Sequence, residues 1–399
     1  MTDLVAIARS LFVPGKGILA ADESVHTATA RLAQYGIATS TEMRREYRDL
    51  FLGAEGVEQY LSGVILFSET LLQKGNDKKL FSKSLAARGI LSGIKVDLGT
   101  EPLPASPQEF ITQGLLDLPK RLEEYKKQRA VFTKWRAVIR IDGDELPTAT
   151  AIHENAKRLA SYAKEVQSAG LVPILEPEVL LEGKHSRARS RAVIEEVLQT
   201  LFSVLAEHSV DRASVIVKTA MALSGDATGK RDTPEEVAED TVAALVASVP
   251  SQVAGIVFLS GGQTPDQATE NLAAITKYAK NVHAPWPLTF SFARALQDEA
   301  LTLSKGKEEN VAAARPAFLA GPAEIEMDGQ RLDEPQAVQQ RAQPESYTGG
   351  EHGDQRADRD QHRQRRHHVP PAAGREELKH AVELHQAWVA RHARSADKK

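Results

Sequence analysis

The feature that most constrains the fold is a regular alternation of short apolar runs with stretches of amphipathic helical period, from about Gly17 to Arg315. This alternation is typical of βα units whose strands are parallel. Eight runs of strand length are present, at 17–21, 63–67, 92–96, 135–141, 171–177, 214–219, 254–260 and 287–291. Eight such units in roughly 300 residues predict an α/β protein with a (β/α)8 TIM barrel, and a doubly wound open sheet is the alternative.

Two helix starts support this register of strands and helices. The sequences TPEE at 233–236 and TPDQ at 264–267 each offer a threonine cap, a proline for the first turn and an acidic or amide side chain that completes a capping box. Both sequences follow a predicted strand. They therefore predict two helices that begin at these positions.

The composition of the chain changes after about Ala320. Residues 320–374 are rich in Gln, Arg, Asp, Glu, Pro and His and lack apolar periodicity, so we expect a disordered polar linker. Residues 375–399 place apolar side chains at helical spacings, which predicts a terminal amphipathic helix that docks on the body or on a partner. The predicted organisation is a barrel domain at 1–319 followed by these two segments.

Overall composition excludes several classes of function. The chain has 50 basic and 54 acidic residues, so no net field favours nucleic acid or an anionic membrane surface. It has no cysteine, which excludes disulfides, thiolate nucleophiles and cysteine-ligated zinc and fits a reducing cytoplasm. No export signal or run of 18 apolar residues is present, so we expect a cytoplasmic protein that acts on small molecules.

The histidines give no metal-binding pattern. Seven of the 12 lie beyond residue 350, and the other five are scattered without a spacing such as HxxxH. We therefore expect no metal site.

Polar side chains gather at the predicted strand ends, where the catalytic groups of TIM barrels lie. They are Asp22, Glu23 and Ser24 after the first run, Lys95 and Asp97 in and after the third, Lys134 and Arg136 at the start of the fourth, Glu176 and Glu178 at the fifth, and Lys218 at the sixth. Each of these alone is typical of a solvated strand end. Together they predict one charged site at the barrel mouth.

The sequence ILEPE places Glu176 and Glu178 two residues apart, so both side chains are predicted to face one side of an extended segment that Pro177 helps to hold. Two close carboxylates raise the pKa of at least one of them, and neighbouring lysines lower it. Such a set can transfer protons near neutral pH. The alternative is a pair of exposed carboxylates.

Lys218 stands in the apolar run SVIVKTAM. One explanation is a lysine that ends a strand and extends its amine to water. The other is a nucleophile, because a lysine that is desolvated beside another cation, such as Lys134 or Lys95, becomes neutral and can form a Schiff base with a ketone.

Two groups of residues predict anion sites on opposite sides of the mouth. Gly261 and Gly262 precede a capped helix start after the seventh run, and Arg294 follows the eighth, where phosphate sites of TIM barrels often lie. A second anion site is predicted from Ser24, Thr27, Arg31 and Lys95. A substrate with two phosphates would span the barrel.

The chain resembles class I fructose-1,6-bisphosphate aldolase, the metal-independent Schiff-base family, from residue 1 to about 319. The matching stretches are GKGILAADES, GVILFSETL, GIKVDLG, FTKWRAVI, VPILEPE, FLSGGQ and PWPLTFSFARALQ, in family order. The resemblance implies a lyase of glycolysis and gluconeogenesis that cleaves fructose 1,6-bisphosphate reversibly to dihydroxyacetone phosphate and glyceraldehyde 3-phosphate. It also implies a cytoplasmic homotetramer without a cofactor.

The resemblance implies a role for each site residue. Lys218 would form the Schiff base, Glu176 would be the main acid and base, Glu178 and Lys134 would tune the site, and Asp22 would act in proton transfer at the C4 hydroxyl. Ser260, Gly261, Gly262, Ala293 and Arg294 would bind the phosphate of the dihydroxyacetone phosphate half, and Ser24, Thr27, Arg31, Lys95 and Arg136 the other end, with Arg44 at a further substrate position.

Three departures from the family pattern stand out. Ala293 replaces a glycine, KTAMALSG replaces the usual KPNMV stretch after Lys218, and the chain ends in SADKK where the family has a tyrosine that closes over the site. Tyr347 is a candidate replacement for that tyrosine. Two alternatives therefore remain open: a barrel scaffold with a partner-binding tail, and another Schiff-base enzyme such as a transaldolase or deoxyribose-phosphate aldolase.

Overall fold

The computed structural model of the chain describes residues 3–323. Its last helix, α12 (Val311–Ala323), continues past the predicted boundary at residue 319. The rest of the predicted linker, the predicted helix at 375–399 and Tyr347 lie outside the described residues.

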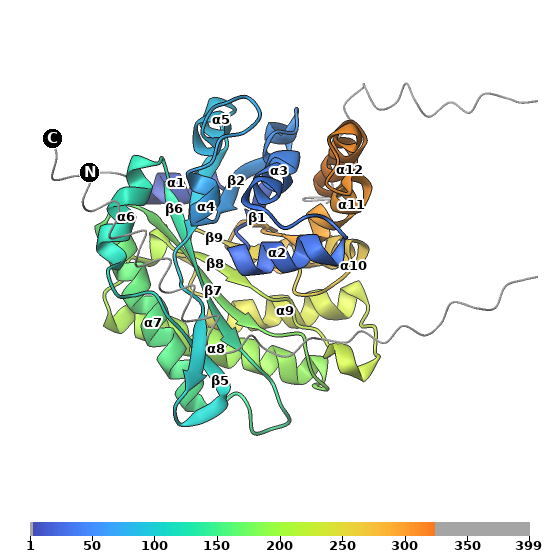
Figure 1. Cartoon of the computed structure of the whole chain (residues 1–399). Coiled ribbons are helices and arrows are strands. Elements are labelled where there is room, and N and C mark those ends of the chain that lie inside the picture. The colour runs from blue at the N-terminus through green and yellow to red at the C-terminus, as the bar shows by residue number, and fades with distance from the viewer. Residues whose placement is uncertain (1–2, 324–399) are drawn as a thin grey trace, which may run out of the picture. The chain divides into compact units, whose positions relative to one another are not determined.

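Eight parallel strands form the central sheet, in the order in which they occur along the chain (Figure 1). They are β1 (Gly17–Ala21), β2 (Leu61–Leu66), β3 (Leu91–Lys95), β6 (Phe132–Ile139), β7 (Val172–Val179), β8 (Ile216–Thr219), β9 (Gly255–Phe258) and β10 (Leu288–Phe290). The first strand approaches the last, since the Ala20 backbone N–H donates to the Phe292 carbonyl at 2.9 Å. The TIM-barrel prediction is confirmed, and the alternative of a doubly wound open sheet is wrong.

Helices follow the strands and cover the outside of the barrel (Figure 1). They are α2 (Val25–Gln34), α3 (Thr41–Leu52), α4 (Ser68–Leu71), α5 (Phe81–Ala87), α6 (Leu118–Lys127), α7 (Ala149–Ser168), α8 (Arg187–Glu207), α9 (Pro234–Ser248), α10 (Pro265–Asn281), α11 (Arg294–Ser304) and α12, after an N-terminal α1 (Leu4–Ser10). Both predicted capping boxes are confirmed, at Thr233 for α9 and at Thr264 for α10.

Successive apolar side chains along the strands belong alternately to two apolar clusters. Phe132, Ile174 and Ile216 belong to a smaller cluster that also contains Leu11 beyond α1, whereas Leu175 and Val217 belong to the larger one shared with the outer helices. Successive side chains of a strand point to opposite faces, so the smaller cluster fills the barrel interior. Residues two and four positions beyond its members therefore point into the barrel mouth.

The predicted start of the fourth strand is wrong. The strand β6 begins at Phe132, so Lys134 and Arg136 lie within it rather than ahead of it. The polar side chains of Thr133 and Lys134 hid this start from a search for continuous apolar runs, although both are buried.

A short hairpin, β4 (Thr100–Leu103) with β5 (Ser106–Thr112), is inserted between β3 and β6 and was not predicted. Its residues are largely exposed, so they form no apolar run. Its Glu109 is nevertheless buried and accepts hydrogen bonds from the backbone and hydroxyl of Thr148, the cap of α7.

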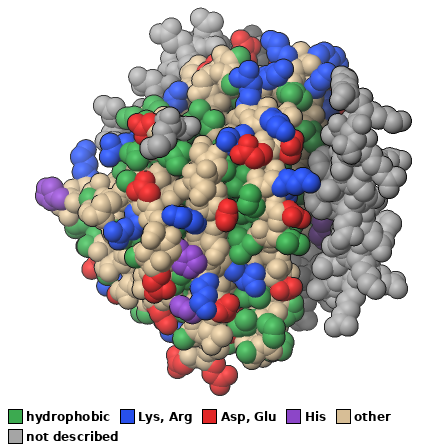
Figure 2. Space-filling model, turned by 90° about the vertical axis from the view of Figure 1, so that its left-hand side faces the viewer, with side chains coloured by type: hydrophobic (Ala, Val, Ile, Leu, Met, Phe, Trp, Pro, Cys, Tyr) green, Lys and Arg blue, Asp and Glu red, His purple; other side chains and the backbone are tan. Residues whose placement is uncertain are grey.

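The outer surface carries both signs of charge. On the face in Figure 2, basic and acidic side chains are interspersed rather than gathered by sign. Among residues 3–323, no helix is both long and apolar enough to cross a membrane.

Candidate active site

Four charged side chains from four strands form a continuous chain of ion pairs. The Lys134 Nζ lies 2.7 Å from Asp22 Oδ2 and 2.9 Å from Glu176 Oε2, and the Lys218 Nζ lies 3.0 Å from Glu176 Oε1. We call Asp22, Lys134, Glu176 and Lys218 the lysine cluster. Asp22 directly follows β1, Lys134 is the third residue of β6, Glu176 lies in the second half of β7 and Lys218 is the last but one residue of β8.

All four side chains of the lysine cluster are buried, and Lys218 is only 4% exposed. An amine that extended to water would be far more exposed. The solvated strand-end interpretation of Lys218 is therefore wrong. The alternation of β8 explains its place, because Ile216 lies in the barrel interior and Lys218 is two residues further on.

The charges of the lysine cluster compensate one another. Burial would raise the pKa of Glu176, but the ammonium groups of Lys134 and Lys218 outweigh it and lower that pKa to about 2. Burial would lower the pKa of Lys134, and the carboxylates of Asp22 and Glu176 raise it instead. The Glu176 carboxylate is thus held ionised.

Glu178 does not form a carboxylate pair with Glu176. Its Oε2 binds Arg136 Nε instead, while Glu176 faces two lysines. Of the two opposing effects expected here, the lowering of the pKa by neighbouring lysines is the one that acts on Glu176. Each cation of β6 pairs with the carboxylate two residues beyond its own register partner on β7, since Lys134 is in register with Ile174 and Arg136 with Glu176.

Lys95 ends β3 and binds the carboxylate of Asp97. Asp97 is buried, and its other oxygen accepts from the backbone N–H of Arg136 at 3.3 Å. The sequence marked Asp97 as a strand-end carboxylate without a role. The structure shows that it connects β3 to β6 beside the lysine cluster.

The loop after β9 combines glycine backbone with a serine and an arginine. Gly261 and Gly262 have φ angles of +57° and +91°, a region that favours glycine. A Cβ on Gly262 would lie 3.9 Å from Arg294 Nη2, so the loop and the first residue of α11 come together. Ser260 is buried at the base of this loop, and Ala293 is the cap residue of α11.

Ser291, at the end of β10, was not among the predicted site residues. It is 1% exposed, and its Oγ has no hydrogen-bond partner among the described residues. Its position directly after the apolar run at 287–290 is a signal that could have pointed to it.

Four of the predicted anion ligands already bind carboxylates of this chain, since Arg31 and Arg44 do so as well as Lys95 and Arg136. Arg31 contacts Glu23 and Asp298, and Arg44 makes two hydrogen bonds to Glu69, at 2.9 and 2.7 Å. By contrast, Ser24 and Thr27 are solvent-accessible at the start of α2, where their hydroxyl oxygens lie 2.9 Å apart.

A second glutamate lies next to Asp22, and its side chain is only 11% exposed. Glu23 binds Arg31 at 2.9 Å and Arg48 at 2.5 Å, and it accepts a hydrogen bond from the Tyr47 hydroxyl at 2.9 Å. We call Glu23, Arg31, Tyr47 and Arg48 the arginine cluster. The sequence had not pointed to Tyr47 or Arg48, which lie on a helix with the ordinary pattern of a packed amphipathic segment.

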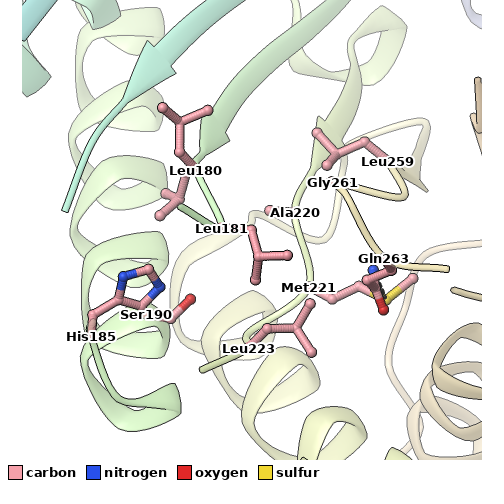
Figure 3. Close-up of a pocket in the computed structure, with 11 residues that line it drawn as sticks. Leu180, Leu181, His185, Ser190, Ala220, Met221, Leu223, Leu259, Gly261 and Gln263 are labelled. Carbon is pink, nitrogen blue, oxygen red and sulfur yellow. Dashed lines mark hydrogen bonds between the residues drawn. The ribbon is translucent and has the colours of Figure 1, made fainter. Parts of the chain in front are cut away.

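A small cavity lies between the loops after β7, β8 and β9 (Figure 3). The Met221 side chain extends to Gln263, whose Nε2 donates to the Met221 sulfur at 3.5 Å, and His185 and Ser190 lie at the other side. Its volume of about 10 Å³ has room for roughly one water molecule, which is too little for a sugar phosphate. Within residues 3–323, no three His, Asp or Glu side chains are grouped so that they could hold a metal ion.

Comparisons with known proteins agree on one family. The family model of glycolytic fructose-bisphosphate aldolase class-I matches residues 3–347. This match extends beyond residue 319, where the resemblance recognised in the sequence ends. The fructose-bisphosphate aldolase of Drosophila melanogaster is 45% identical over 318 residues, with 79% of this chain and 87% of that protein covered. That of Schistosoma mansoni is 47% identical over the same shares of the two chains.

A solved structure supports the same assignment. The fructose-bisphosphate aldolase from Plasmodium falciparum, in a ternary co-crystal with TRAP and a small-molecule inhibitor, is 40% identical and superimposes with a TM-score of 0.78. The match covers 81% of this chain and 92% of that one. The sequence stretches, the barrel and the comparisons together show that the chain belongs to the class I fructose-bisphosphate aldolase family.

Proposed function

We propose that this class I fructose-bisphosphate aldolase cleaves fructose 1,6-bisphosphate through an imine between Lys218 and the C2 carbonyl of the sugar. The observation that carries the proposal is the buried contact of 3.0 Å between Lys218 Nζ and Glu176 Oε1. An amine held in an apolar strand beside a carboxylate has both the nucleophile and the proton acceptor that imine formation needs.

Glu176 serves as the base and then as the acid of imine formation. Its carboxylate is ionised at rest, since its pKa is lowered to about 2. It takes a proton from the attacking amine and returns it to the carbinolamine hydroxyl, which leaves as water. The iminium that results withdraws electrons from the C3–C4 bond.

Asp22 accepts the proton of the C4 hydroxyl when the C3–C4 bond breaks. The electron pair of the C3–C4 bond then enters the iminium to give an enamine, and glyceraldehyde 3-phosphate departs. Protonation of the enamine at C3 and hydrolysis of the imine release dihydroxyacetone phosphate. Lys134 forms ion pairs with Asp22 and Glu176 and tunes the site together with Glu178.

The two phosphates are bound at opposite sides of the mouth. The C1 phosphate contacts the loop after β9 and the start of α11, at Ser260, Gly261, Gly262, Ala293 and Arg294. The C6 phosphate contacts the set Ser24, Thr27, Arg31, Lys95 and Arg136, with Arg44 further out. Accessible hydroxyls at Ser24 and Thr27 and the positive φ angles of the glycine pair support this assignment.

Borohydride trapping tests the proposal. The protein is incubated with dihydroxyacetone phosphate, reduced and digested, and the modified peptide is mapped. We expect one label on Lys218 and no label on Lys218→Ala, while Lys134→Ala, which removes the neighbouring buried lysine, still traps at Lys218. A label on another lysine, or full activity of Lys218→Ala, contradicts the assignment.

The alternative of another Schiff-base enzyme is wrong at the level of family, because the chain belongs to the fructose-bisphosphate aldolases. A coupled assay that compares fructose 1,6-bisphosphate with fructose 1-phosphate measures which substrate is preferred. The alternative of a scaffold with a partner-binding tail stays a prediction, since that tail lies outside the described residues.

Assembly and location are part of the same proposal. The family resemblance favours a homotetramer, which light scattering of the purified chain tests. Two Arabidopsis thaliana aldolases named as cytosolic are 44% and 46% identical to this chain and support a cytoplasmic location, in glycolysis and gluconeogenesis. Cell fractionation tests the location.

A further inference from the structure

Three polar residues, Ser24, Thr27 and Arg31, lie along one face of α2 and its cap. Ser24 caps the helix, and Thr27 and Arg31 follow at spacings of three and four residues, which places the three side chains along one face. Of these, Ser24 and Thr27 are accessible, whereas Arg31 is only 6% exposed.

The Arg31 guanidinium makes contacts in the interior through one nitrogen and near the surface through another. Its Nη1 donates to Glu23 Oε1 at 2.9 Å and to Gln297 Oε1 at 2.8 Å, in the interior. Its Nη2 donates to Asp298 Oδ1, and the Asp298 side chain is 38% exposed. The buried end is therefore fixed, and the outer end is occupied by a carboxylate at the surface.

A carboxylate oxygen and a phosphate oxygen are alternative partners for the same guanidinium N–H groups. Asp298 lies on α11, one turn after Arg294, and so comes from the opposite phosphate site. With Asp298 present, Glu23 and Asp298 balance Arg31 and Arg48, and the group has no net positive charge to offer a second anion.

We propose that Asp298 is a specificity-determining residue that occupies the phosphate-binding end of Arg31, so that the C6 phosphate must displace a carboxylate of the enzyme. This inference rests on the proposed function. The competition lowers the affinity for a bisphosphate and narrows the preference for fructose 1,6-bisphosphate over fructose 1-phosphate.

The test measures KM for both substrates in the full chain and in Asp298→Ala and Asp298→Asn. We expect the ratio of KM for fructose 1-phosphate to KM for fructose 1,6-bisphosphate to rise about two- to fivefold in Asp298→Ala, the range of one partly exposed ion pair. Asp298→Asn keeps the shape of the side chain and shifts the ratio in the same direction by less. If Asp298→Ala does not fold, the measurement with Asp298→Asn replaces it.

Glu299→Gln is the matched control, because it removes one negative charge from the exposed neighbouring position of α11. We expect it to leave the ratio at the wild-type value. In an Arg31→Lys background, Asp298→Ala should lose most of its effect, since the planar group that the carboxylate occupied is gone.

An unchanged ratio in both Asp298 variants overturns the inference, as does an equal shift in Glu299→Gln. A wild-type protein that cleaves neither substrate contradicts the proposed function instead. The two failures are therefore distinguishable in one set of assays.

Discussion

Two glutamates in this barrel, Glu176 and Glu23, have little exposed surface and similarly lowered pKa values, but the cations that lower those values differ. Burial opposes ionisation of both, yet Lys134 and Lys218 lower the pKa of Glu176 to about 2, and Arg48 and Arg31 lower that of Glu23 to about 2. Glu176 belongs to a strand and meets lysines from neighbouring strands. Glu23 follows a strand and meets arginines from α2 and α3.

The difference lies in what the cations can do. A lysine can lose its proton and form a covalent bond, whereas an arginine stays charged and binds with fixed planar geometry. In the arginine cluster every oxygen of Glu23 is engaged, and even its backbone carbonyl accepts from Arg48 Nη2 at 3.0 Å. The comparison teaches that a depressed carboxylate pKa does not by itself distinguish a reactive site from a structural one.

Exchanging the types of cation is the strongest way to break this comparison. We expect Lys218→Arg to lower kcat for fructose 1,6-bisphosphate by at least about 10⁴-fold, because a guanidinium forms no imine. The opposite exchange, Arg48→Lys, should keep kcat within a few-fold and lower the free energy of unfolding by about 1–3 kcal/mol through lost hydrogen bonds. Steady-state cleavage and urea denaturation measure the two effects. A stable but inactive Arg48→Lys would mean that the arginine cluster takes part in catalysis.

Neutralising each glutamate in turn gives the next largest effect. Glu176→Gln removes the proposed proton acceptor and should lower kcat by about 10²–10⁴-fold, with imine trapping slowed in parallel. Glu23→Gln leaves two buried arginines with one fewer carboxylate and should lower the free energy of unfolding by about 3–5 kcal/mol. If Glu23→Gln were as stable as the wild type, the arginine cluster would not be the framework that its contacts indicate.

Acid unfolding should reveal both carboxylates together. Each has a folded-state pKa of about 2, against an ordinary value of 4.5, so its stabilisation is complete above pH 4.5 and is lost as the pH falls toward 2. The loss amounts to roughly 3 kcal/mol for each group. Urea denaturation between pH 5 and pH 2 (about the range of these pKa values) measures how the free energy of unfolding depends on pH. This dependence should be shallower in Glu176→Gln and in Glu23→Gln than in the wild type. A slope that only one variant changes would separate the two clusters electrostatically.

Two buried tyrosines give the smallest effect and the sharpest control. Tyr47 donates to the carboxylate of Glu23, whereas the Tyr162 hydroxyl is 2.6 Å from the neutral hydroxyl of Thr133. We expect Tyr47→Phe to cost about 2 kcal/mol and Tyr162→Phe about 1 kcal/mol of unfolding free energy, because hydrogen bonds to charged groups are stronger. Equal costs in thermal and urea unfolding would show that the charge of Glu23 adds nothing to its contact with Tyr47.

Much of the fold followed from local sequence. The alternation of strands and helices and the two capping boxes depend on neighbouring residues, and all were predicted. The hairpin at 100–112 and the first residues of β6 were not, because exposed strands and polar inward-facing residues lack an apolar run. Periodicity reports burial, and it is silent where a strand is exposed or where its buried side chains are polar.

The candidate site was predictable in its members but not in its pairings. The sequence placed Lys218, Glu176 and Lys134 at one mouth, because parallel strands of a barrel end on the same side. It could not tell that Glu176 faces Lys134 while Glu178 faces Arg136, since that depends on a diagonal offset between β6 and β7. The expected pair of glutamates was therefore replaced by two separate ion pairs.

By itself the sequence predicted the barrel and the chemical groups at its mouth, since both follow from short-range alternation, but it left open whether Lys218 faces inward or ends its strand in water. Only the tertiary structure decided which carboxylate meets which cation. Arg31 and Gln297 are 266 residues apart, and Asp298 is one residue further. Contacts of this range are made by closure of the barrel, which brings α2 and α11 together, and no local pattern of residues encodes them.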